Sequence, residues 1–173
     1  MAESSVSVEK LLAQHCLELA EIIEKIAPQD YVSSNPNGSI GEQVRHGLDH
    51  LQALLAGAEA EIIDYEQRRR GWVGERKPAL AVSELRQLSH CFHRLSGADP
   101  TRSLSVVVQV DPGQEPAQWP STWGRECVAM LSHEVHHAAM LRPRLEAAGC
   151  SLPAHFGIAP STVAHRSTCA ASA

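Results

Sequence analysis

The chain has 173 residues, a formal net charge of −5 at pH 7 and a hydrophobic fraction of 43%. This length suits one domain, residues 1–173, and the aromatic fraction of 4% favours an aliphatic, largely helical core. The acidic balance offers no basic surface to a phosphate backbone, and no stretch approaches the roughly 18 apolar residues of a membrane span. We therefore expect a cytoplasmic protein that binds neither nucleic acid nor membrane.

The first half of the chain predicts two helices. Apolar residues recur at three- and four-residue steps over residues 7–27, which predicts an amphipathic helix. A loop rich in turn-forming residues follows at 33–38. Ser39 and Glu42 then have the spacing of a capping box. A second helix is expected to start there and to cover residues 40–67.

The second half predicts two further helices with a β-prone run between them. Leucine and phenylalanine spacing indicates a third helix over residues 80–95, and a fourth is expected over residues 122–148. Residues 104–110 are rich in β-branched side chains and predict one arm of a small hairpin. Four amphipathic helices around one core predict the all-α class, a four-helix bundle with a small β-hairpin-like insertion before the last helix.

The ends of the fourth helix carry their own signals. Ser121 or Thr122 is a suitable N-cap. Pro143 removes a hydrogen bond from the helix and should kink it or end it near Arg142. Glycines and prolines recur after about residue 150, so an irregular C-terminal tail is expected from there.

Histidines are the candidate functional residues. Two imidazoles four residues apart on a helix lie on one face and can direct ring nitrogens at one metal ion. The fourth helix carries His133 and His137 in this relation, and the second carries His46 and His50. Gly47 leaves room for a close neighbour beside the second pair. Three histidines with an open position would make a catalytic type of site, whereas four would make a closed, structural one.

Three more side chains are candidates for roles beside the ion or in proton transfer. Glu126 falls on the same face as the histidine pair of the fourth helix, two turns earlier, whereas His136 points about 60° to the side of it. His50 is available in the same way if it is not itself a ligand. These assignments follow only from positions on helix faces.

Four segments of the chain resemble the DinB/YfiT-like superfamily of bacterial four-helix-bundle proteins. They are GSIGEQVRHGLDH at 38–50, DYEQR at 64–68, GRE at 124–126 followed by SHEVHHA at 132–138, and LPAHFGIAPST at 152–162. The resemblance implies an up-down-down-up bundle that is often a homodimer. It also implies a divalent metal site, usually nickel, zinc or iron, with an open position, and it places this site on His46, His133 and His137.

The family resemblance leaves the reaction open. Relatives include transferases and isomerases that use low-molecular-weight thiols, so one hypothesis is a metal-dependent transferase or hydrolase with a small molecule or thiol at the open position. The alternative is a metal-binding stress-related or structural protein without turnover, which a fourth ligand such as His50 would favour. A third hypothesis is a plain bundle whose histidines are only packed. His50 and His136 are each available to replace or supplement a family ligand.

Overall fold

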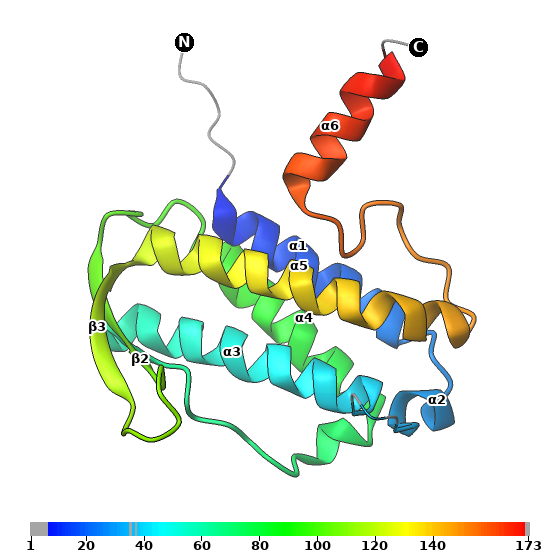
Figure 1. Cartoon of the computed structure of the whole chain (residues 1–173), viewed down its shortest axis with the longest axis horizontal. Helices are drawn as coiled ribbons and strands as arrows, with labels where there is room; N and C mark the ends of the chain where they lie inside the picture. The colour runs from blue at the N-terminus through cyan, green and yellow to red at the C-terminus, as the bar shows by residue number, and fades with distance from the viewer. Residues whose placement is uncertain (1–6, 35, 37, 172–173) are drawn as a thin grey trace.

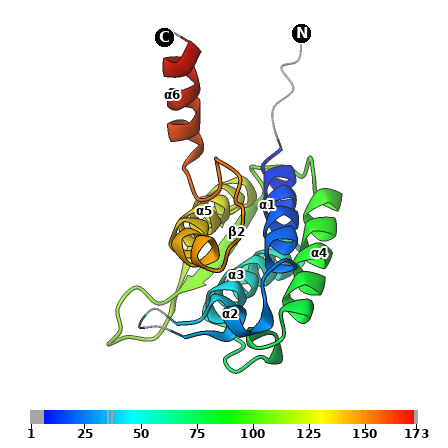
Figure 2. The same ribbon diagram turned by 90° about the vertical axis from the view of Figure 1, so that its right-hand side faces the viewer.

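The computed structural model describes residues 7–34, 36 and 38–171, and four long helices form its main body. Both α1 and α3 pack against α4 and α5 (Figures 1 and 2). No helix in the described part of the chain is long and apolar enough to cross a bilayer. The helices are α1 (Val8–Ile23), α2 (Pro28–Val32), α3 (Ile40–Ala60), α4 (Pro78–Arg94), α5 (Trp123–Ala147) and α6 (Pro160–Ala171), with a short 3-10 turn, η1 (Val73–Glu75), before α4.

The core between the long helices is mainly aliphatic, as the composition predicts, although its largest fully buried side chains are aromatic. Its largest members are fully buried and come from all four long helices and from the segments that join them. They include Leu12, Ile23, Tyr31, Leu48, Leu51, Leu54, Leu85, Phe92 and Trp123.

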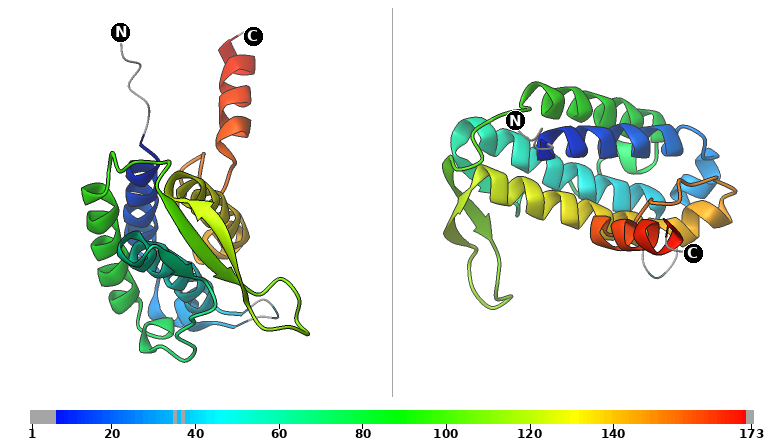
Figure 3. Two further views of the ribbon diagram at one scale, coloured as in Figure 1. Left: turned by 90° about the vertical axis from the view of Figure 1, so that its left-hand side faces the viewer. Right: turned by 90° about the horizontal axis from the view of Figure 1, so that it is seen from above.

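A mixed three-stranded sheet covers one end of these helices (Figures 1 and 3). Its strands are β1 (Ile62–Asp64), β2 (Ser103–Val108) and β3 (Ala117–Thr122), in the order β1-β2-β3. β1 runs parallel to β2, and β2 pairs antiparallel with β3. The predicted all-α four-helix bundle is therefore wrong as a fold class, because six helices are combined with a mixed sheet, although helix predominates.

The sheet exists because α3 ends earlier than predicted, at Ala60. Glu61 adopts a left-handed conformation with φ of 58°, which turns the chain out of the helix. Ile63 is then fully buried against Gly57, where a Cβ atom would overlap Cγ1 of Ile63. The amide of Ser105 donates to the carbonyl of Glu61 at 2.9 Å. The spacing of apolar residues cannot show that Ile62 and Ile63 belong to a strand, because both also fit the apolar face of a helix that continues past Ala60.

The fourth predicted helix begins as expected but passes through its proline. The hydroxyl of Thr122 accepts from the amide of Arg125 at 3.4 Å, which confirms Thr122 as the N-cap of α5. Pro143 lies on the exposed side and α5 continues to Ala147, close to the predicted limit of 148, so the alternative of an end near Arg142 is wrong. Leu141 and Leu145 are buried on the opposite side, and their packing holds the last turns together.

The prediction of an irregular tail is wrong for its second half, which forms α6. This helix extends away from the packed helices (Figure 1). The segment before it is irregular and wraps α5, where Arg142 donates from Nη2 to the carbonyl of Phe156 at 2.5 Å and from Nε at 3.0 Å. Phe156 is 2% exposed, so this segment is fastened to the core.

Gly57→Ala should lower the free energy of unfolding by about 1–3 kcal/mol, because the added methyl group must displace Ile63 from the end of α3. Chemical denaturation would measure the loss. Gly113→Ala is the matched control, since its Cβ would meet only the Asp111 carboxylate at 3.4 Å. Equal midpoints for the two variants would contradict this account of how β1 docks on α3.

Candidate metal centre

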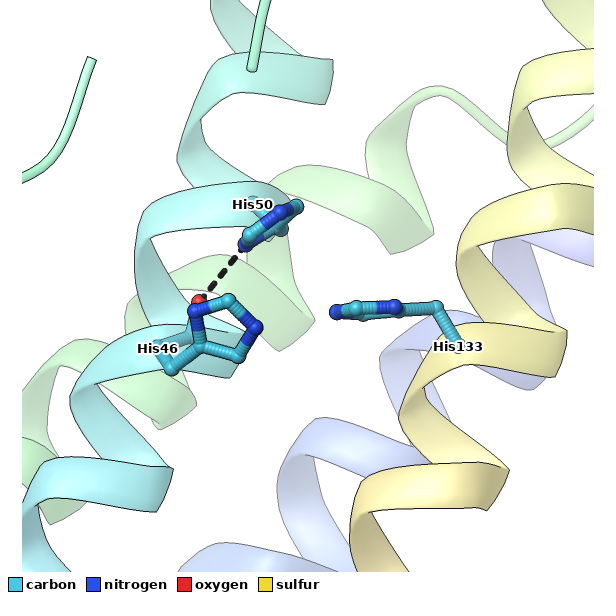
Figure 4. Close-up of side chains that lie close together, drawn as sticks. All are labelled: His46, His50 and His133. Carbon is cyan, nitrogen blue, oxygen red and sulfur yellow. Dashed lines mark hydrogen bonds between the residues drawn. The ribbon is translucent and has the colours of Figure 1, made fainter. Parts of the chain in front are cut away.

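Four histidines of α3 and α5 face one another and form what we call the histidine cluster: His46, His50, His133 and His137. Neighbouring ring centroids are 4.4 Å apart for His46–His50 and His133–His137, and 4.6 Å apart for His50–His133 and His46–His137. One nitrogen from each of His46, His50 and His133 lies within 4.8 Å of the other two. Figure 4 shows His133 directed from α5 into the space beside the two α3 rings. This arrangement can hold a metal ion.

The cluster forms because α3 and α5 approach closely at Gly47. A Cβ atom there would stand 2.9 Å from Oε2 of Glu134, a carboxylate that is 2% exposed. The close neighbour predicted for Gly47 is therefore Glu134. Burial opposes ionisation of this carboxyl, but His15, which lies 3.4 Å from Oε2, together with His133 and His137 holds the pKa of Glu134 below its usual range.

Two imidazoles of the cluster, those of His50 and His137, have Nδ1 contacts of the kind that orient ligating histidines. Nδ1 of His50 donates to the carbonyl of His46 at 2.9 Å, and Nδ1 of His137 lies 3.2 Å from Oε1 of Gln43. An imidazole that donates through Nδ1 keeps the lone pair of Nε2 for a metal, and bonds of this kind orient ligating histidines. Nε2 of His133 is buried without a hydrogen-bond partner in the described structure. Such an atom is costly unless something binds it, so the donor set fits a divalent transition metal.

Burial keeps three rings of the cluster, those of His46, His133 and His137, in the neutral form that binds metal. Burial lowers the pKa of His46 to about 3, and the neighbouring histidines add to the shift. Burial and the same neighbours lower the pKa of His133 to about 4. The pKa of His137 is also lowered, chiefly by burial. These three rings are therefore uncharged at neutral pH, each with one N–H proton and one nitrogen lone pair.

All three predicted ligands, His46, His133 and His137, belong to the cluster, and His50 completes it. The mutually closest nitrogens are those of His46, His50 and His133, so His50 is at least as well placed as His137. His136 is exposed, and its ring centroid lies 5.6 Å from that of His137 on the outer side of α5.

A pocket of about 290 Å³ opens beside the cluster and is lined there by His50 and His133. The ring of Tyr65 stacks on His50 with centroids 5.7 Å apart and an angle of 22° between the ring planes. The rest of the lining comes from the loop after β1, the end of β2 and the first turns of α5: Glu66, Arg68, Val108, Gln109, Arg125, Glu126, Ala129 and Met130.

Glu126, predicted to lie on the histidine face of its helix, lines this pocket, and its carboxylate already accepts three hydrogen bonds. It accepts from the hydroxyl of Tyr65 at 3.0 Å, from the hydroxyl of Ser121 at 2.5 Å and from Nη1 of Arg125 at 2.8 Å. Burial, and then the charge of Glu126, raise the pKa of Tyr65, so its hydroxyl stays protonated. Glu126 thus orients Tyr65 against His50.

The loop after β1 is fixed by a buried carboxylate that sequence reasoning did not identify. Asp49 is 3% exposed and accepts from Nε of Arg69 at 2.7 Å, from the amide of Arg69 at 3.2 Å and from Nη1 of Arg45 at 3.0 Å. The guanidinium of Arg69 also lies 4.7 Å from the ring centroid of Trp72. The Arg69–Asp49 contacts join residues 20 positions apart, which spacing does not indicate, whereas Arg45 and Asp49 have the i,i+4 spacing of a helical ion pair.

Comparison with known proteins does not establish a family. No protein-family model matches the chain. A segment of 106 residues is 27% identical to a protein named FK506-binding protein 5 from Rhizopus delemar. This match covers 60% of the chain and only 27% of that protein.

The metal-free protein should lose stability as the pH falls from 6.5 towards 4. An unfolded histidine takes up a proton near pH 6.5, whereas folded His46 and His133 do so only at about 3 and about 4. The unfolded chain therefore binds more protons in this window, and stability rises with pH across it. Denaturant titrations of chelator-treated protein at pH 7 and pH 5 would measure the difference. A double variant His46→Gln, His133→Gln with an undiminished pH dependence would contradict this origin.

Proposed function

We propose that this chain binds one divalent transition-metal ion, nickel, zinc or iron, through three nitrogens of the histidine cluster and acts on a small molecule in the adjoining pocket. The observation that carries this proposal is the buried Nε2 of His133, which has no hydrogen-bond partner in the described structure and points at nitrogens from a second helix. The resemblance to the DinB/YfiT-like superfamily supports the same proposal, since its motif falls on His46, His133 and His137.

The chemistry we propose is that of a metal-dependent transferase or hydrolase, with a low-molecular-weight thiol as one class of substrate. A bound divalent ion would supply Lewis acidity, which polarises a ligand at its open position. The protein contributes a pocket that has His50 and His133 in its lining. Tyr65, held by Glu126, contributes a hydroxyl group and a flat ring beside His50.

The fourth histidine favours a second candidate, a metal-binding stress-related or structural protein without turnover. If all four rings of the cluster coordinate the ion, no position remains for a substrate. The even spacing of the rings, 4.4 to 4.6 Å between neighbours, is compatible with this closed arrangement.

Elemental analysis of protein purified without an affinity tag tests metal binding. About one equivalent of a transition metal is expected in the parent protein, and almost none in a His46→Ala, His133→Ala double variant, because each loses a ligand from a different helix. The control removes two exposed histidines of α4, His90→Ala and His93→Ala, and should keep the metal. Parent protein that takes up no nickel, zinc or iron even on titration would refute the proposal.

Azide added to cobalt-substituted protein tests whether a position is open. We expect the visible spectrum of the cobalt to change, because a site with three protein ligands can accept azide. A spectrum that azide leaves unchanged, in protein holding one equivalent of cobalt, would instead support the closed four-histidine site and the non-catalytic candidate.

A further inference from the structure

The pocket beside the histidine cluster contains one cationic group that the protein itself leaves unused. Four charged side chains line it. Arg125 and Glu126 pair with each other at 2.8 Å, and Oε1 of Glu66 accepts from the amide of Gln109 at 2.9 Å. Arg68 forms no hydrogen bond or ion pair with any of the residues that the structure describes.

The backbone on both sides of Arg68 is fastened to the fold. On one side, the amide of Tyr65 donates to the carbonyl of Val107 at 3.2 Å. On the other, Arg69 is bound to the buried Asp49 through both its amide and its Nε. Arg68 therefore starts from a fixed position at the pocket wall, and only its side chain has to be ordered when a ligand binds.

Arg68 lines the same pocket as His50 and His133 of the histidine cluster. Val108, Ala129 and Met130 supply the apolar part of the lining. A volume of about 290 Å³ is small for a ligand site, so it suits a short molecule.

We propose that the ligand of this pocket is a small carboxylate with a short aliphatic body, whose carboxylate pairs with the guanidinium of Arg68 while its other end reaches the histidine cluster. Arg68 is then a specificity-determining residue, because a planar guanidinium can bind a carboxylate through two parallel hydrogen bonds. This inference rests on the proposed function, since it assumes a metal with a position open to the pocket.

Two thiols that differ only in charge test the inference. The cobalt-substituted full chain is titrated with 3-mercaptopropionate and with its uncharged analogue 3-mercapto-1-propanol, and the dissociation constants are read from the visible spectrum. We expect the parent protein to bind the carboxylate about tenfold more tightly. Arg68→Gln should reduce this preference to about threefold or less, whereas Arg68→Lys, which keeps the charge but not the planar fork, should retain part of it.

Arg70→Gln is the matched control, because Arg70 is exposed in the same loop and does not line the pocket. It should keep the preference of the parent protein. Equal affinity for the two thiols in the parent, or a full preference in Arg68→Gln, would overturn the role of Arg68 and leave the proposed function standing. If neither thiol changes the spectrum of metal-loaded protein, the metal has no position open to a thiol. That result would refute the proposed catalytic site and, with it, this inference.

Discussion

Close contact between α3 and α5 depends on the absence of a side chain at Gly47, where the buried carboxylate of Glu134 takes the space. Nε2 of His15, on α1, lies 3.4 Å from Oε2 of the same carboxylate, so three helices meet at one charged group. Taking a carboxylate out of water is costly unless it is paired, and the pairing with His15 therefore constrains how the helices can be arranged. Where α3 and α5 meet at Gly47, the histidine pairs of these two helices face each other.

The candidate site was largely predictable, because it depends on local spacing. Two histidines four residues apart must share a helix face, and the capping box of Ser39 and Glu42 fixes where α3 begins. That the two pairs meet was inferred from the family resemblance, and the ring distances agree with it. Spacing puts His50 on the same face as His46, but it does not show whether His50 or His137 lies nearer to the other two rings, because that depends on how far α3 is rotated against α5.

The fold was predicted less well, for reasons that lie in contacts between distant residues. β1 was assigned to a helix because Ile62 and Ile63 continue the apolar pattern, and only the contact of Ile63 with Gly57 and the pairing with β2 show otherwise. Pro143 was expected to kink α5 or to end it, and α5 does not end there, because the burial of Leu141 and Leu145 outweighs one missing hydrogen bond. The pocket wall that carries Arg68 depends on the same misassigned strand, so it could not be anticipated.

The central claim is that one metal ion lies between α3 and α5, and anomalous X-ray diffraction from crystals of metal-loaded protein tests it most directly. Data collected at the absorption edge of the bound metal should give a single strong peak within coordination distance of Nε2 of His133 and of at least one α3 histidine. A peak only at exposed histidines such as His90 and His93, or none at the histidine cluster, would contradict the claim.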